Sequence, residues 1–205
     1  MPYPVGKLKW DETGEREFET GVDHGILFPI ADNGTYPFGV VWNGLTSVSE
    51  SPEGGEPTAL YADNTKYLEM MSNEEWKGTI EAYMYPDEFM ECDGSKSPVA
   101  GVSLGQQSRK KFALVYRTRK GNDVAGDALG YKLHIVYGLM ASPSEKSYET
   151  VNDSPDAVTF SWSISSTPIT LEGYKPVSTI VIDSTDVDED KLAAFLTIIE
   201  GTDPV

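Results

Sequence analysis

The segment Gly101-Val-Ser-Leu-Gly105 matches the G-x-S-x-G elbow of serine hydrolases, and Asp123 and His134 follow it in the order that those enzymes use. Such an elbow presents its serine on a sharp turn between a strand and a helix. Here a loop containing Pro98 precedes the pattern, and a polar stretch that leads to a strand follows it. We therefore interpret the segment as a glycine-containing loop and expect Ser103 to be inert.

Two acidic clusters contain residue types that metal or acid–base chemistry needs. Asp186-Val-Asp-Glu-Asp190 resembles the start of a calcium loop, but Lys191 stands where that loop needs glycine, and a predicted helix follows. Acids in the first turn of a helix are the better explanation. The acids within residues 87–93 could act as a glycosidase pair only in a cleft that raises the pKa of one of them. We expect these acids to be solvated on a short polar helix.

The sequence lacks the residue patterns that other cofactor chemistries need. The two histidines, His24 and His134, are far apart, and Cys92 is the only cysteine, so neither zinc spacing nor an intrachain disulfide is possible. No phosphate-binding loop or dinucleotide fingerprint is present. We expect no catalytic residue, no metal and no cofactor, and the chain is predicted not to be an enzyme.

The charge balance is strongly acidic. Acids outnumber bases 33 to 16, which gives a formal charge of −17 over 205 residues. Such a chain is poorly suited to neutralising the phosphates of DNA or to binding an anionic membrane. Neither a signal peptide at the N-terminus nor a membrane-spanning run is recognisable, so we expect folding in a cytoplasm and no membrane partner.

One segment runs against this balance. Residues 109–120 hold six of the sixteen bases and no acid. Alternation over 111–119 places Lys111, Arg117 and Arg119 on one face of a predicted strand. We predict that these three bases lie at a boundary between subunits, opposite acids of another copy, with the acidic 11–19 region as a candidate. The alternative is a basic strand edge that discourages aggregation.

The remaining pattern predicts one mainly β domain over residues 1–205, with antiparallel strands and one or two flanking helices. Strands are expected at 25–30, 40–48, 76–85, 111–119, 131–137, 158–164 and 179–182, and helices at 86–91 and 188–200. The 188–200 segment has an apolar stripe formed by Leu192, Phe195, Leu196 and Ile199. Residues 1–22 are predicted to form an arm, and 51–57 and 121–130 to form loops that neighbouring copies order.

Longer stretches resemble the major tail proteins of siphophages that infect Gram-positive bacteria. The resemblance runs in order through nearly the whole chain. It rests on residues 1–10 and 21–30, on Trp42-Asn-Gly-Leu45, on 56–63 and 81–89, on Gly105-Gln-Gln107, and on 142–146, 152–155 and 160–162. This family has no catalytic motif, so overall similarity carries the resemblance.

The resemblance implies two packed antiparallel sheets with a flanking helix, in hexameric rings whose strands join into a barrel. Stacked rings would form the tail tube that conducts viral DNA. The expected partners are further copies, the tape-measure protein, the tail terminator and distal tail proteins, and DNA that passes without specific binding. The expected location is the virion tail, assembled in the bacterial host cytoplasm.

A tube of this kind must let DNA pass without capture, so polar strand faces with acidic or neutral character are expected to line its lumen. The predicted lumen residues are Thr79, Glu81, Thr159, Ser161 and Ser163. The main alternative is a phage baseplate or receptor-binding β-sandwich module, which would bind carbohydrate through exposed aromatics such as Tyr36, Trp42 or Tyr148. A hydrolase is the third possibility.

Overall fold

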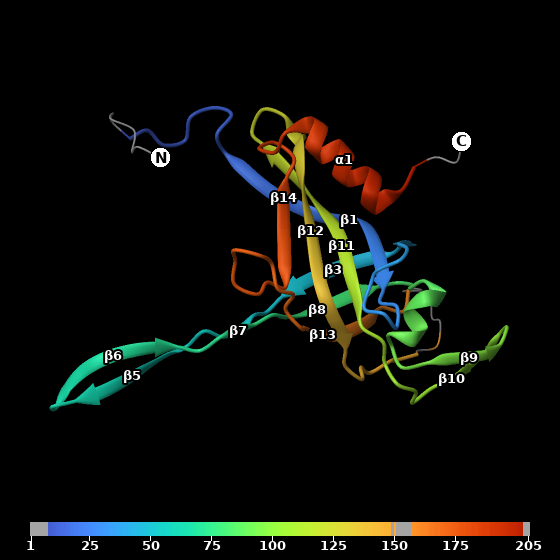
Figure 1. Ribbon diagram of the computed structural model, residues 1–205. Helices are drawn as coiled ribbons and strands as arrows, with labels where there is room; N and C mark the ends of the chain where they lie inside the picture. Colours follow the sequence, from blue (N-terminus) through green and yellow to red (C-terminus); the bar gives the residue numbers. More distant parts are fainter. Residues whose placement is uncertain (1–7, 149, 151–156, 203–205) are drawn as a thin grey trace.

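The computed structural model describes residues 8–148, 150 and 157–202, and within them the chain is mainly antiparallel β (Figure 1). The strands are β1 (Glu17–Pro29), β2 (Val40–Trp42), β3 (Leu45–Glu50), β4 (Glu53–Gly54), β5 (Pro57–Ala62), β6 (Thr65–Met71), β7 (Glu74–Glu75), β8 (Lys77–Ala82), β9 (Lys96–Val99), β10 (Val102–Leu104), β11 (Phe112–Asn122), β12 (Gly126–Ala141), β13 (Phe160–Ser166) and β14 (Thr179–Asp183). A 3₁₀ helix, η1 (Asp87–Glu91), and an α-helix, α1 (Glu189–Glu200), complete the fold. This confirms the predicted fold class.

The main sheet folds back on itself into two layers. Its strand order is β2-β1-β11-β12-β13-β8-β3, and β14 pairs with β12 off this path. In Figure 1 the strands β11, β12 and β14 run nearly upright, whereas β3, β8 and β13 cross below them. Apolar side chains from both halves form one buried cluster, centred on Trp42, Trp162, Phe89 and Phe112. These aromatic rings meet edge-on or tilted, an arrangement that aromatic side chains prefer.

β12 connects the two halves. One stretch of it pairs with β14 through residues 132–136, and its last three residues, 139–141, pair with β13. Gly138 lies between these stretches with φ at +61°, and a Cβ there would come within 2.3 Å of the Thr167 carbonyl oxygen. Only glycine fits this backbone without strain, so Gly138 allows the strand to change partners.

A second apolar cluster lies on the outer face of the sheet, under α1. Val115, Leu133 and Ile135 are buried there, and the helix contributes Phe195, Leu196 and Ile199. Asp188 precedes the helix, and its Oδ1 accepts a hydrogen bond from the Lys191 backbone N–H at 3.1 Å. The predicted apolar stripe is therefore confirmed: Leu192 is buried as well, and the other three residues pack on the sheet.

Hairpins project from this body. β5 and β6 form the longest, which extends from the short β4–β7 pair, and β9 and β10 form another near η1 (Figure 1). Residues 51–57 are thus the base of a hairpin rather than a free loop. Neither hairpin was predicted from the sequence.

Two predicted boundaries are wrong. Residues 17–22 belong to β1 and pair with β11, so the described part of the arm ends at Arg16; residues 1–7 of the predicted arm lie outside the described residues. Residues 121–130 are the tip of the β11–β12 hairpin, where Gly121 and Asn122 end one strand and 126–130 begin the next. The first segment was predicted as an arm because it is polar and acidic, and the second as a loop because it contains three glycines. Gly121, Gly126 and Gly130 of the second segment all take part in strand pairing.

Candidate functional site

Polar side chains gather on one face of the β3–β8–β13 layer. Thr79 lies opposite Ser163 and Glu81 opposite Ser161 in the β8–β13 register. Directly paired residues point to the same side of an antiparallel sheet, so these four residues share a face. The fifth predicted lumen residue, Thr159, is exposed immediately before β13. The structure therefore brings together four of the five residues, whereas their position in a lumen stays a prediction.

The other face of this layer is core. Ile80, Ala82 and Trp162 are fully buried, and Phe160 packs against the same cluster. The adjacent edge strand β3 extends the polar face with Ser47 and Ser49, which pair with Glu81 and Thr79. These two serines were not predicted as part of this face, because Asn43-Gly44 obscured where β3 begins.

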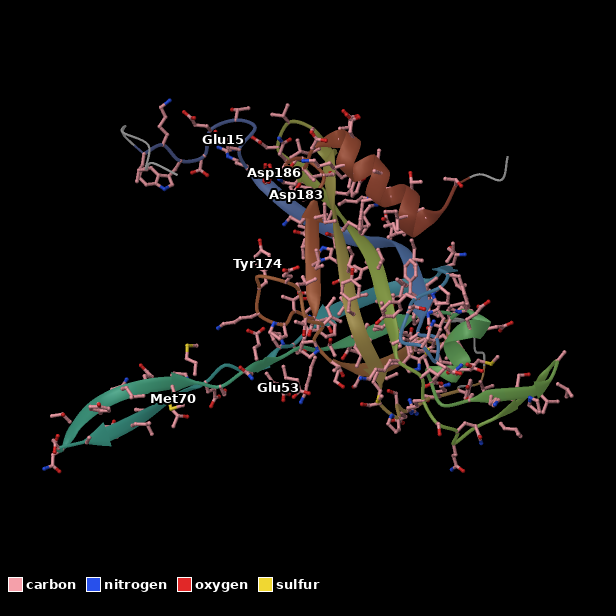
Figure 2. The ribbon with its side chains drawn as sticks, viewed as in Figure 1. Glu15, Glu53, Met70, Tyr174, Asp183 and Asp186 are labelled. Atoms are coloured by element: carbon pink, nitrogen blue, oxygen red, sulfur yellow. The ribbon has the colours of Figure 1, made fainter. Side chains whose placement is uncertain are left out.

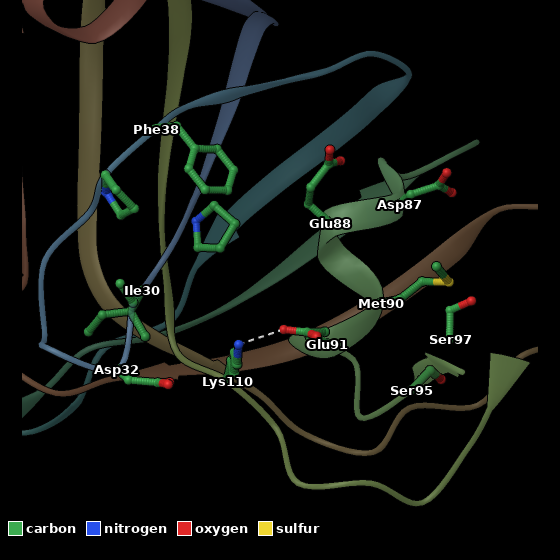
Figure 3. A pocket seen from close by; sticks show the side chains of 13 residues that line it. Ile30, Asp32, Phe38, Asp87, Glu88, Met90, Glu91, Ser95, Ser97 and Lys110 are labelled. Atoms are coloured by element: carbon green, nitrogen blue, oxygen red, sulfur yellow. Dashed lines mark ion pairs between the residues drawn. The ribbon is translucent and has the colours of Figure 1, made fainter. Parts of the chain in front are cut away.

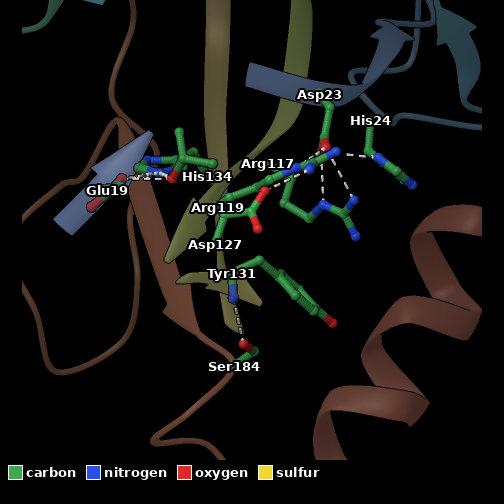
Figure 4. Close-up of polar contacts among 10 residues, drawn as sticks. Glu19, Asp23, His24, Arg117, Arg119, Asp127, Tyr131, His134 and Ser184 are labelled. Atoms are coloured by element: carbon green, nitrogen blue, oxygen red, sulfur yellow. Dashed lines mark hydrogen bonds and ion pairs between the residues drawn. The ribbon is translucent and has the colours of Figure 1, made fainter. Parts of the chain in front are cut away.

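The basic strand β11 is paired with acids of its own chain. Arg117 donates from Nε to Asp23 Oδ1 at 2.7 Å and from Nη2 to Asp23 Oδ2 at 3.2 Å (Figure 4). Arg119 donates to the same carboxylate at 3.2 Å and to Asp127 at 3.4 Å. The hydrogen bond from Arg117 lowers the pKa of Asp23 to about 2, against the opposing effect of burial.

Neighbouring bases follow the same pattern. Lys120 lies 3.1 Å from Glu17 and 3.2 Å from Asp183, and the hydrogen bonds raise its pKa. Lys132 on β12 lies 2.6 Å from Glu19. The acidic N-terminal half of β1 therefore balances the basic end of β11 within one chain.

Arg117 and Arg119 thus have an acidic partner within their own chain, whereas acids of another copy opposite them stay a prediction. Their main acidic partner, Asp23, comes from the adjacent strand β1 of the same chain, which the sequence analysis had assigned partly to an arm. Lys111 lies just before β11, and its Nζ donates to Thr167 Oγ1 at 2.8 Å. The location of these bases at a subunit boundary remains a prediction. Half of the Arg119 side chain is exposed, so it is more accessible than Arg117.

A second polar cluster surrounds His134, on β12. Its ring stacks on Tyr116, with 4.7 Å between the ring centroids, and its Nε2 lies 2.9 Å from Thr118 Oγ1. Tyr116 donates from its hydroxyl to Glu50 at 2.8 Å. Burial lowers the pKa of His134 and raises that of Tyr116. No local pattern predicts this cluster, because its members come from three separate strands.

The hydrolase residues do not meet. Ser103 is exposed on β10, in a hairpin with no helix after it. Asp123 accepts a hydrogen bond from Gly14, and His134 is bound as described above. In Figure 1 the β9–β10 hairpin and the β11–β12 turn lie at opposite ends of the molecule. The arrangement therefore lacks the contact between nucleophile and base that this chemistry needs.

The acidic clusters also have structural roles. Asp188 caps α1, and within the described residues no group of three or more histidine, cysteine or acidic side chains could hold a metal ion. Asp93 departs from the expected solvated cluster: it is buried, accepts from Trp162 Nε1 at 3.1 Å and pairs with Lys146. Its carboxylate thus anchors the core tryptophan.

The aromatics proposed for a carbohydrate-binding module do not form one surface. Trp42 is only 2% exposed and belongs to the core, so its expected exposure is wrong. Tyr36 is half-buried beside Tyr137, whereas Tyr148 is exposed and contacts Phe160.

The β5–β6 hairpin is the largest feature that the sequence analysis missed. Asp63 and Asn64 both have positive φ, at 49° and 62°, which matches the two-residue turn that favours tight hairpins. Apolar residues flank this pair on both sides, although they do not alternate with polar ones. This turn signal was present in the sequence and could have found the hairpin.

Among the residues that the structure places, no helix is long and apolar enough to cross a membrane. A scan against protein-family models finds no match, and a search of curated protein sequences finds none either.

Proposed function

We propose that the chain is a structural subunit of a bacteriophage tail tube, and that hexameric rings of it stack into a conduit for viral DNA. The observation that carries this proposal is the β5–β6 hairpin, which projects from the body with its side chains in solvent (Figure 2). An isolated two-stranded hairpin is at best marginally stable in water. A partner surface that covers this hairpin would stabilise it.

Apolar side chains occupy both faces of the hairpin. Cross-strand partners share a face, so Leu60, Leu68 and Met70 lie on one side. Pro57 and Met71 lie on the other. Met70 is 58% exposed and Met71 73% exposed, which is unusual for large apolar side chains that function in water. A hairpin that is apolar on both sides suits insertion between two neighbouring subunits.

The sheet edges also support contact between neighbouring subunits. β3 and β2 stand at the ends of the strand order, and no described strand pairs with the outer side of β3. Open edges are templates for pairing with another chain. Edge-to-edge pairing of copies would join their sheets into the continuous barrel that the resemblance to tail proteins implies.

The polar face of β3, β8 and β13 would line the lumen. Glu81 and the hydroxyls of Thr79, Ser161 and Ser163 would not exchange counterions with DNA as lysine or arginine would. Repulsion from wall carboxylates is screened over about 8 Å at physiological salt, so it would act near the wall and centre the duplex. The tape-measure protein, the tail terminator and the distal tail proteins would be the further partners.

Negative-stain microscopy of the concentrated protein tests the proposal. Rings or tubes of uniform diameter are expected, and a protein that stays monomeric up to millimolar concentration would contradict self-assembly. Mixing the isolated chain with host cells tests the baseplate or receptor-binding alternative, because an adhesin binds cells as a single chain. Replacing Glu81 with Lys should leave rings intact and slow DNA ejection from particles that carry the variant.

A further inference from the structure

A groove of about 540 Å³ opens between the end of β1 and η1. Its apolar lining comes mainly from Pro29, Ile30, Pro37, Phe38 and Met90. Figure 3 shows Phe38 on one wall and Glu88, on η1, on the other. Phe38 is 53% exposed, so an aromatic ring is available to a ligand in this groove.

The groove is acidic. Asp32, Asp87, Glu88 and Glu91 line it, together with a single base, Lys110. Lys110 lies 2.7 Å from Glu91, and within the described part of the chain no ion pair engages the other three acids. An occupant with an apolar body and positive charge would therefore complement both the apolar lining and the negative potential of the acids.

We propose that this groove receives residues 1–10 of a second copy of the chain. That segment, Met1-Pro-Tyr-Pro-Val-Gly-Lys-Leu-Lys-Trp10, contains two lysines and no acid in a chain of charge −17. Pro2 and Pro4 favour the extended polyproline conformation, which docks into grooves lined by aromatic side chains at low entropic cost. The inference rests on the proposed function only in taking the partner to be another copy.

The described residues of this segment agree with such docking. Leu8 is 64% exposed and Trp10 75% exposed, although both are apolar. Lys9 pairs with Glu12 at 2.8 Å, but both side chains are exposed, so exchanging this contact for a groove acid would cost little. The segment therefore presents exposed apolar and positively charged side chains.

The two lysines of this segment do not reach the groove of their own chain. Gly14 is tied to the β11–β12 turn, because its N–H donates to Asp123 and its carbonyl accepts from Asn122, both at 2.9 Å. Lys7 is seven residues further, or at most about 25 Å of chain. The groove starts at Pro29, at the far end of the 13-residue strand β1, which spans about 40 Å. Another copy must therefore supply the lysines that face the groove acids, and with them the docked segment.

The experiment uses a fluorescent peptide of residues 1–10, capped at both ends and titrated with the full chain at concentrations where it is monomeric. Saturable binding is expected.

Replacing Asp87 and Glu88 with Lys should weaken peptide binding by about tenfold or more, because two attractions become repulsions. Phe38→Ala should also weaken binding. Replacing Glu189 and Asp190 with Lys is the matched control, since these are also consecutive exposed acids in a first helical turn, and should change binding by less than about twofold.

Charge exchange makes the test specific. A peptide with Lys7→Glu and Lys9→Glu should bind the wild-type chain poorly and the Asp87→Lys, Glu88→Lys chain better. Absence of saturable binding, or equal loss in the groove and control variants, would overturn the inference. Binding to monomers without any ring formation would contradict only the proposed function. Normal rings from the groove variant, together with unchanged peptide binding, would contradict only the inference.

Discussion

Arg117 lies opposite Asp23 in the β1–β11 register, and its guanidinium donates to both oxygens of that carboxylate. The register of β1 shifts on either side of Asp23, where the positive φ of His24 marks an irregular backbone. The guanidinium also lies over the Tyr131 ring, 5.0 Å from its centroid. The ion pair thus fixes β1 to β11 where regular pairing is interrupted.

Arg117→Ala should lower the free energy of unfolding by about 1–3 kcal/mol, because it leaves a part-buried carboxylate without its main partner. Urea denaturation followed by tryptophan fluorescence measures this. Arg119→Ala is the control: half of that side chain is exposed, so its loss should cost less than about 1 kcal/mol. Equal effects of the two variants would contradict the assignment of Arg117 as the main partner.

The same pair predicts a pH dependence. The pKa of Asp23 falls from 3.8 to about 2 in the folded chain, so the unfolded chain takes up the proton first as pH decreases. The stabilisation, about 2 kcal/mol, is complete above pH 4 and is lost as pH falls through about 2. The difference in stability between wild type and Asp23→Asn should therefore shrink between pH 4 and 2. A constant difference over that window would refute the linkage.

His134 predicts loss of stability in a milder pH range. Burial lowers its pKa below 6.5, while Glu19 and Glu50 oppose that shift and Lys132 adds to it. The unfolded chain therefore binds a proton at His134 first, and stability should decrease as pH falls below about 6.5. His134→Phe keeps an aromatic ring beside Tyr116 and removes the titration. Denaturation at pH 8 and at pH 5 should show a smaller decrease in the free energy of unfolding for this variant than for the wild type. Equal decreases for the two proteins would count against the prediction.

Local patterns predicted the elements whose side chains alternate or follow a helical stripe. β8, β11, β13, β14 and α1 were all expected within a few residues, because each has one face in an apolar cluster. The polar face around Thr79 and Glu81 followed from the same alternation. The resemblance to tail proteins predicted two layers, and the structure has them as halves of one folded sheet.

Partners distant in the sequence could not be predicted in this way. Asp23 and Arg117 are 94 residues apart, and nothing local indicates that β1 lies beside β11. The groove likewise depends on how the end of β1 and η1 come together. The β5–β6 hairpin was missed for another reason: apolar residues on both of its faces hide the two-residue period of a half-buried strand.

Gly138 should tolerate no side chain. Its φ of +61° and the close approach of the Thr167 carbonyl mean that Gly138→Ala adds both strain and a clash with backbone. We expect a loss of more than about 1 kcal/mol in unfolding free energy. Gly105→Ala is the control, since a Cβ there meets nothing within 4 Å and Gly105 lacks a positive φ. Similar stabilities of the two variants would show that β12 can bend without a glycine.

Apolar residues of the β5–β6 hairpin should matter for assembly and not for the fold of one subunit. Met70 and Met71 are 58% and 73% exposed, so Met70→Ser with Met71→Ser removes little buried area from the monomer. Unfolding free energy should change by less than about 1 kcal/mol, whereas the concentration needed for rings should rise by about tenfold or more. Sedimentation over a range of concentrations measures the second quantity. Ile198→Ser, at a 78% exposed position on α1, is the control for a general loss of surface hydrophobicity and should leave assembly unchanged. If both variants assemble like wild type, the hairpin does not contact a neighbouring subunit.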